Sequence, residues 1–234
     1  MIKVTGHRGV AGLEPENTLR SIRRAIELGV DGVEIDVRVT KDGRLVVIHD
    51  ETVDRTTNGH GYVKELTFDE IRRLDAGKGE KVPILEEVLE ATRGKVELQI
   101  ELKVAEATDP VLRLIEKENA EREIIITSFM HDLLRRVHEF NPELRTGALF
   151  FNVEEDICKK ALNVYSEAIH VYYRNIDDEL VRRAHEMGLK IEAWNPDEPE
   201  EMMKMIKLGV DSIGTNRPDI LLNLLRKMKM RWKK

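Results

Sequence analysis

Cysteine and long apolar runs are scarce in this chain of 234 residues. Cys158 is the single cysteine, so an intrachain disulfide framework is excluded. No apolar run approaches the roughly 20 residues that a membrane-spanning helix needs. The chain leads from Met1 directly into a strand-like segment, without the charged and apolar regions of a secretory leader. We therefore expect a soluble, cytoplasmic protein.

An excess of positive charge is also lacking. The formal net charge of -6 disfavours a nucleic-acid partner held through its phosphates, although residues 226–234 are locally basic. The last segment has helical apolar spacing with Lys and Arg between, which suits a membrane surface but more often the closing helix of a barrel. Membrane contact is therefore the lesser expectation. With 35% charged residues and a single glutamine, Gln99, the composition is typical of a thermophile.

Strand-like and helix-like patterns alternate along almost the whole chain. The expected strands are 3–7, 32–39, 44–49, 95–102, 123–128, 145–150, 168–172, 190–194 and 212–215. The expected helices are 17–28, 84–92, 108–118, 130–140, 153–163, 177–187, 198–207 and one from about 218. Such alternation is typical of βα units around a parallel sheet, and the length suits one barrel of about 250 residues. We predict an α/β fold, a single (β/α)8 TIM-type barrel over residues 1–234.

Two irregularities interrupt this repeat. Residues 40–43 are too few for a crossover between parallel strands, so the second and third strands should form an antiparallel β-hairpin. Asp36 then lies roughly opposite Ile48 and His49. Residues 50–82 are too long for an ordinary βα loop and are rich in Thr, Gly and charge, with one short helix at 67–74. We interpret residues 50–82 as an insertion that forms a small cap over the mouth of the site.

Several strand-like runs end in side chains that can take part in catalysis. A strand's period of two places Glu34 and Asp36 on one face of the second strand, against a core. His7, His49 and Glu101 end three other runs. Buried carboxylates ionise only when they are paired or bound to a metal, so three acids beside two histidines indicate a divalent-metal site with an acid and a base. The plainer interpretations are a solvated acidic face on an edge strand, a turn-capping histidine and an ion pair within one strand.

Nine short motifs follow one another along the chain. They are HRG at 7–9, PENT at 15–18, EID at 34–36, TKDG at 40–43, HD at 49–50, DRTTNG at 54–59, IELK at 100–103, SF at 128–129 and GVD at 209–211. In this order and spacing the chain resembles the glycerophosphodiester phosphodiesterase family. The resemblance implies a barrel like that of phosphatidylinositol phospholipase C. It also implies hydrolysis of glycerophosphodiesters to sn-glycerol 3-phosphate and an alcohol with one divalent cation.

The resemblance also assigns roles to individual residues. It makes His7 and His49 the general acid and base, Glu34, Asp36 and Glu101 the metal ligands, and Arg8 and Lys103 the groups that hold the phosphate. Oxygen ligands suit Mg2+, Ca2+ and Mn2+ alike, so the ion is not specified. By similarity to the phospholipase C group, the substrate's own 2-hydroxyl attacks first and gives a cyclic glycerol phosphate that water then opens. Direct attack by water is the lesser expectation.

The remaining candidates concern the substrate. Phe129 and Trp194 end strands and suit contacts with a glycerol or alcohol moiety, although core packing is nearly as good an interpretation. The other histidines are expected at the surface or in packing, and among them only His60, inside the insertion, is placed to reach a substrate; they are His60, His131, His138, His170 and His185. Asp197 stands where the family usually has Asn, and Asn216 where it often has Asp. We expect both to line the mouth and to affect substrate range more than chemistry.

The leading hypothesis is metal-dependent hydrolysis of glycerophosphodiesters by two-histidine acid/base catalysis. The alternative is a lysophospholipase D that cleaves lysophospholipids with the same site. An apolar mouth built from the insertion would favour this alternative, but residues 52–64 are polar. A non-catalytic barrel would have been indicated by loss of a histidine or carboxylate from the set, and none is missing. The expected partner is a small-molecule substrate, and the sequence does not reveal the preferred alcohol or the oligomeric state.

Overall fold

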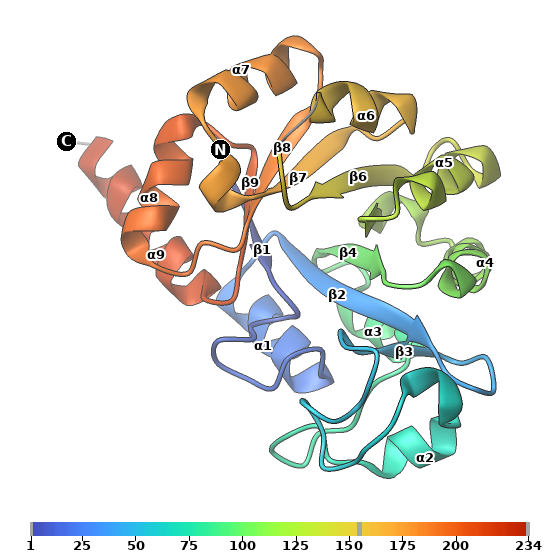
Figure 1. Cartoon of the computed structure of the whole chain (residues 1–234). Helices are drawn as coiled ribbons and strands as arrows, with labels where there is room; N and C mark the ends of the chain where they lie inside the picture. Colours follow the sequence, from blue (N-terminus) through green and yellow to red (C-terminus); the bar gives the residue numbers. More distant parts are fainter. Residues whose placement is uncertain (1, 154–155, 233–234) are drawn as a thin grey trace.

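The computed structural model describes residues 2–153 and 156–232, which form a ring of strands surrounded by helices (Figure 1). The strands are β1 Lys3–Gly6, β2 Gly32–Val39, β3 Leu45–Val47, β4 Glu97–Leu102, β5 Ile124–Ser128, β6 Arg145–Phe150, β7 Ala168–Tyr172, β8 Lys190–Trp194 and β9 Ser212–Thr215. Their order is β1-β9-β8-β7-β6-β5-β4-β2, and pairing of β1 with β2 closes the barrel. The eight strands of the ring are parallel to their neighbours. The predicted (β/α)8 barrel is therefore confirmed.

Helices connect most successive strands of the barrel, and one more follows the last strand. They are α1 Leu19–Leu28, α2 Phe68–Arg73, α3 Leu85–Thr92, α4 Thr108–Glu118, α5 His131–Phe140, α6 Ile157–Asn163, α7 Asp178–Glu186, α8 Pro199–Leu208 and α9 Pro218–Trp232. The helix expected at 153–163 begins at Ile157, where the Asp156 side chain caps its first turn, and residues 154–155 lie outside the described residues. Along the described part of the chain, no helix is both long and apolar enough to cross a bilayer. The side chains beyond residue 228 lie outside the described part, so the membrane expectation for the last segment stays a prediction.

The predicted hairpin is confirmed and explains the ninth strand. β2 is eight residues long, and on one edge it pairs with β4 over most of its length. On its other edge, β1 pairs only with Gly32 and Val33, whereas β3 runs antiparallel to residues 37–39. The backbone N–H of Ile48 donates to the carbonyl of Asp36 at 3.0 Å, which is the predicted register. The hairpin therefore brings the segment after β3, with His49, to the carboxyl end of the barrel.

The hydrophobic core lies between the sheet and the helices, and the barrel lumen is polar. Val33, Ile35 and Val37 of β2 are fully buried on the outer face, while Glu34 and Asp36 alternate with them on the inner face. Buried polar residues from other strands also line the lumen. TIM barrels usually fill this space with Val, Ile and Leu. A polar lumen indicates that the inside of this barrel serves chemistry more than stability.

A second, smaller core lies under residues 50–82. It is formed by buried residues of the β3 region and of the segment itself, namely Val46, Ile48, Val53, Val63, Ile71, Ala76 and Val82. Figure 1 shows α2 and the flanking loops at one side of the barrel, next to β3. A capping box between Thr67 and Glu70 begins α2, because the Thr67 hydroxyl accepts from the Glu70 N–H and the Glu70 carboxylate accepts from the Thr67 N–H. The segment is thus a folded unit attached to the hairpin.

Candidate active site

A cavity of about 240 Å³ opens at the carboxyl ends of the barrel strands. Eight of the nine site residues predicted from the sequence line it, namely His7, Arg8, Glu34, His49, Glu101, Lys103, Phe129 and Trp194. The ninth, Asp36, is fully buried next to them. This end of a TIM barrel is where active sites are found. The tertiary structure therefore brings together residues that lie up to 187 positions apart, from His7 to Trp194.

Three carboxylates from β2 and β4 form a compact cluster. Each of Glu34, Asp36 and Glu101 places an oxygen within 4.8 Å of the other two, and the β2–β4 register sets Asp36 beside Glu101. Burial, with the neighbouring Asp36 charge, raises the pKa of Glu101 to about 7 and that of Glu34 well above its usual range. Burial and mutual repulsion therefore oppose full ionisation of the three carboxylates in the absence of a cation. All the ligand atoms that the cluster offers are hard oxygens.

The surroundings of Asp36, in contrast, favour its ionised form. Burial alone would raise its pKa, but Arg8, Lys103 and the amide of Asn17 lower it below the usual value. Asn17 Nδ2 donates to Oδ2 at 2.8 Å, whereas Oδ1 has no hydrogen-bond donor and lies 3.6 Å from Lys103 Nζ. An ionised, buried oxygen without a donor fits a position that faces a cation.

Two cationic side chains stand beside the acids. Arg8 Nε lies 3.2 Å from Asp36 Oδ2, and Lys103 Nζ donates to Glu101 Oε1 at 2.6 Å. Arg8 is held by an unusual backbone turn, with φ of 49° at Arg8 and 84° at Gly9. A Cβ on Gly9 would lie 2.4 Å from Ser21 Oγ, so only glycine fits this turn. The HRG motif therefore aims Arg8 into the cavity while keeping its backbone against α1.

The two histidines differ in their partners. His7 Nδ1 lies 2.7 Å from Asn216 Oδ1, and its Nε2 lies 3.3 Å from Asn195 Nδ2 and 3.8 Å from Glu34 Oε2. His49 Nδ1 lies 2.6 Å from the carboxylate of Asp50. Burial, assisted by the Arg8 charge, lowers the pKa of His7 to about 4. Burial also lowers the pKa of His49, although Asp36 and Asp50 act against it. His7 is therefore a neutral imidazole near pH 7.

Arg55 connects residues 50–82 to both sides of the site. Its guanidinium donates to Asp50 at 2.7 and 3.0 Å and to Glu16 at 2.8 Å through two nitrogens. Glu16 in turn accepts from Arg8 Nη1 at 2.7 Å. A chain of ion pairs therefore runs from Arg8 to His49 through Arg55. Sequence reasoning did not identify Arg55, although it lies in the DRTTNG motif.

Four other polar residues were considered from the sequence, and the structure places each of them. His170 is a buried residue of β7 at the floor of the cavity, with Nδ1 3.2 Å from Glu192 Oε1. The alternation of β7, in which His170 and Tyr172 share a face, was the signal that it points inward. His60 does not line this cavity; its side chain is 88% exposed and pairs with Asp54. Asp197 and Asn216 are not among the residues that line the cavity; Asn216 contacts His7, and Asp197 contacts Asn216.

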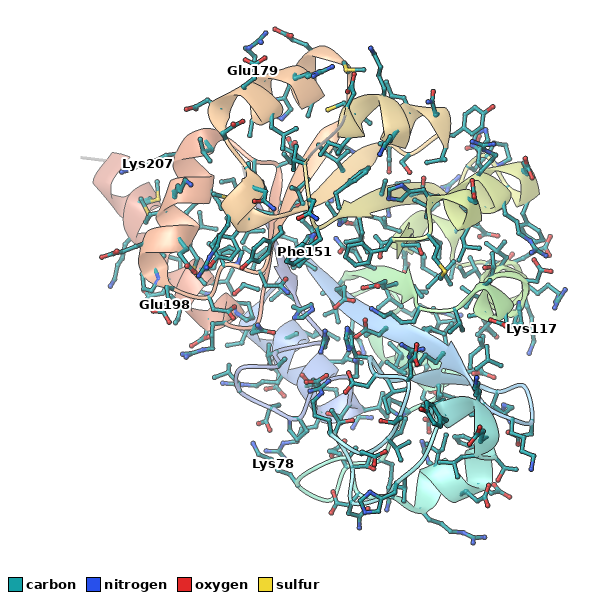
Figure 2. The ribbon with its side chains drawn as sticks, in the orientation of Figure 1. Lys78, Lys117, Phe151, Glu179, Glu198 and Lys207 are labelled. Atoms are coloured by element: carbon teal, nitrogen blue, oxygen red, sulfur yellow. The ribbon has the colours of Figure 1, made fainter. Side chains whose placement is uncertain are left out.

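Aromatic side chains cover the opposite side of the mouth. We call Phe129, Phe151, Tyr172 and Trp194 the aromatic wall; they follow or end β5, β6, β7 and β8. Trp194 lies 5.3 to 6.0 Å, ring centre to ring centre, from the other three. Phe129 and Phe151 are 45% and 54% exposed, which excludes simple core packing for both. Figure 2 shows Phe151 near the middle of the barrel, whereas the labelled lysines and glutamates lie at the periphery.

Comparison with known proteins agrees with this geometry. Residues 7–220 match the family model described as the glycerophosphoryl diester phosphodiesterase family. A glycerophosphodiester phosphodiesterase of Caldanaerobacter subterraneus subsp. tengcongensis is 44% identical over 96% of this chain and 98% of its own length. A putative glycerophosphoryl diester phosphodiesterase of Silicibacter pomeroyi has a TM-score of 0.92 at 28% identity, covering 97% of this chain and 94% of that one.

A further structural relative carries a ligand. An Oleispira antarctica phosphodiesterase in complex with the product sn-glycerol-3-phosphate has a TM-score of 0.91 at 25% identity. The match covers 96% of each chain.

Proposed function

This chain belongs to the glycerophosphoryl diester phosphodiesterase family, and we propose that it hydrolyses glycerophosphodiesters to sn-glycerol 3-phosphate and an alcohol with one divalent cation. The observation that carries the proposal is the meeting of three carboxylates, two histidines and two cationic side chains in and beside one cavity. The product named for the Oleispira relative supports the same substrate class. Family membership makes the chain a phosphoric diester hydrolase.

Glu34, Asp36 and Glu101 would hold the cation. The donor-free Oδ1 of Asp36 and the raised pKa values of Glu34 and Glu101 fit a position where a positive charge is needed. A bound Mg2+, Ca2+ or Mn2+ supplies charge neutralisation at the phosphate and leaves coordination positions for substrate oxygens. Arg8 and Lys103, now paired with these acids, would turn to the phosphate oxygens once the acids are engaged.

His7 would act as the general base and His49 as the general acid. In the first step, His7 Nε2 takes the proton of the substrate's 2-hydroxyl, whose oxygen forms a bond to phosphorus. The bond from phosphorus to the alcohol oxygen breaks, and His49 donates a proton to that oxygen. Water then attacks the cyclic glycerol phosphate, and the histidines exchange roles as the ring opens. Direct attack by water on the diester is the alternative and forms no cyclic phosphate.

Residues 50–82 would act as a cap that belongs to the single barrel domain. Its support is the Arg55 guanidinium, which bridges Asp50 beside His49 and Glu16 beside Arg8. Because the bridge joins the two sides of the mouth, the cap would hold the acid and the phosphate-binding arginine at a fixed separation.

The aromatic wall favours a second candidate, lysophospholipase D activity. An apolar mouth was expected in the insertion if lysophospholipids are substrates, but the apolar surface lies at the ends of β5 to β8. Met130 directly follows Phe129, Val153 lies two residues after Phe151, and both are exposed apolar residues, at 39% and 36%. An acyl chain could lie along this surface while the phosphodiester occupies the charged side.

The test is release of glycerol 3-phosphate from glycerophosphocholine by chelator-treated protein, with Mg2+, Ca2+ and Mn2+ restored in turn. Lysophosphatidylcholine is assayed in parallel, and phosphorus NMR follows any cyclic phosphate. We expect turnover that returns with metal and a transient cyclic species. Turnover of lysophosphatidylcholine alone would replace the first candidate by the second. No turnover of either substrate with any ion would contradict both.

A further inference from the structure

A hydrogen-bond relay runs behind His7, away from the cavity. His7 Nδ1 meets Asn216 Oδ1 at 2.7 Å, and Asn216 Nδ2 donates to Asp197 Oδ2 at 2.7 Å. The other carboxylate oxygen of Asp197 accepts from the backbone N–H of Asn216 at 2.9 Å and from the Thr215 hydroxyl at 2.8 Å. The backbone N–H of Arg217 donates to the Thr215 oxygen, so the Thr215 proton is directed at Asp197. Every polar atom of the relay therefore has a partner.

The chemistry of the relay allows only one arrangement of donors and acceptors. A carboxylate only accepts, so Asn216 must turn its NH2 group to Asp197 and its oxygen to His7. An amide oxygen also only accepts, so Nδ1 of His7 must carry a proton. In the neutral ring the lone pair then sits on Nε2, which faces the cavity and the NH2 group of Asn195.

We infer that Asp197 is a positioning residue that sets the tautomer of His7 through Asn216. Its consequence for catalysis rests on the proposed function, in which His7 Nε2 is the base. Asp197 and Asn216, which both depart from the usual family pattern, therefore form one hydrogen-bonded unit. This unit acts on the chemistry of His7, whereas the sequence led us to expect a role in substrate range at the mouth.

Asp197→Asn tests the inference because it removes a charge without changing the shape. The backbone N–H of Asn216 and the Thr215 hydroxyl still need an acceptor, so the new amide keeps its oxygen there and turns its NH2 group to Asn216. Asn216 must then rotate and present its own NH2 group to His7. We expect the ring proton to move to Nε2, which removes the base. The expected loss in kcat is about 100-fold, with KM for glycerophosphocholine nearly unchanged.

Nitrogen-15 chemical shifts of the His7 ring in the Mg2+-loaded protein report the tautomer directly, and a His7→Gln spectrum assigns the signals. The double exchange Asp197→Asn with Asn216→Asp balances all the bonds again, because a carboxylate at position 216 accepts both from His7 and from the new amide. We expect it to restore the Nδ1–H tautomer and most of kcat. The matched control is Asp219→Asn in the first turn of α9, because its carboxylate pairs with the guanidinium of Arg217 and takes no part in the relay.

The outcomes separate this inference from the proposed function. An unchanged tautomer in Asp197→Asn, or a double exchange that keeps the Nε2–H form, overturns the inference. A changed tautomer with unchanged kcat upholds the relay and removes His7 from the role of base. If Asp197→Asn does not fold, the tautomer of His7 in the double exchange still tests the inference, because an Nε2–H form there overturns it. The NMR measurement needs no substrate, so it remains valid if glycerophosphodiesters are not turned over.

Discussion

Nδ1 of His49 lies 2.6 Å from Oδ1 of Asp50, so a carboxylate directly supports this imidazole. Arg55 holds Asp50 in place and keeps the pKa of its carboxyl well below the usual range. A negative charge beside Nδ1 stabilises the protonated ring, which an acid requires. His7, in contrast, meets an uncharged amide oxygen at the corresponding atom. This asymmetry is the basis for the assignment of His49 as the acid.

Asp50→Asn should therefore weaken the acid. Loss of the carboxylate lowers the pKa of His49, and an acid works only below its pKa, so the alkaline limb of the pH profile of kcat should move to lower pH. At pH 7.5 we expect kcat to fall about 10-fold or more. Asp54→Asn is the control, because Asp54 pairs with the exposed His60 in the same segment. An alkaline limb that stays in place would refute the support from Asp50.

Removal of the histidines should separate chemistry from metal binding. His7→Ala and His49→Ala should each lower kcat at least about 100-fold and leave Mn2+ affinity nearly unchanged, because neither ring belongs to the acidic cluster. Glu34→Ala and Asp36→Ala should instead weaken Mn2+ binding, measured by calorimetry. If both histidine variants keep near wild-type rates at saturating metal, the acid and base are misassigned.

Metal binding should release protons at mildly acid pH. Without metal, burial and Asp36 raise the pKa of Glu101 to about 7, so Glu101 carries a proton at pH 6, and burial also raises the pKa of Glu34. A cation binds the ionised forms, so Mg2+ uptake at pH 6 should release more protons than at pH 8.5, and affinity should rise with pH between them. Calorimetry in two buffers of different ionisation enthalpy measures the release, and Glu101→Gln should reduce it. Equal release at both pH values would contradict the raised pKa values.

The aromatic wall can be tested through substrate choice. Phe151→Ala removes a ring that is 54% exposed, so it should cost little stability. If an acyl chain lies on the wall, KM for lysophosphatidylcholine should rise about fivefold or more, since a buried ring contributes about 1 to 2 kcal/mol, while KM for glycerophosphocholine stays within about twofold. Phe140→Ala is the matched control, because Phe140 is 44% exposed on α5 and does not belong to the aromatic wall. Equal changes in KM for both substrates would show that the wall contacts the glycerophosphocholine group that the two substrates share.

Glu192 should make the fold sensitive to acid. It is buried in the lumen, where its carboxylate faces His170 and accepts from Gln99 and Ser212 at 2.9 and 2.7 Å. Burial opposes ionisation, but these partners lower its pKa to about 2, against 4.5 as the ordinary value. Its contribution, roughly 3 kcal/mol, is therefore present above pH 4.5 and lost as the pH falls towards 2.

The comparison for Glu192 uses urea unfolding at pH 7 and pH 3. Glu192→Gln should be less stable than wild type at pH 7, and its stability should change less between the two pH values. Glu167→Gln, at a half-exposed residue near the barrel bottom, should behave like wild type. Equal acid sensitivity of wild type and Glu192→Gln would refute the argument.

Much of the site follows from local rules that the sequence contains. The strand period of two sets Glu34 and Asp36 on one face, and the short link at residues 40–43 forces a hairpin that brings His49 towards them. Each inference involves neighbours in sequence, where covalent geometry limits the choices. The motif order then linked these residues to a family and so to Glu101, Arg8 and Lys103.

Closure of the barrel decided the rest. Strand alternation can place His170 on the inner face, but whether Glu192 meets it there depends on the pairing of β7 with β8 and on Gly147, whose absent Cβ leaves room for the His170 ring. Asp197 and Asn216 follow β8 and β9, and only the ring of strands brings them behind His7, which follows β1. The sequence by itself determined the elements, the hairpin and the residues proposed to react. The tertiary structure alone decided which distant side chains hold those groups, because such contacts depend on how all eight strands close.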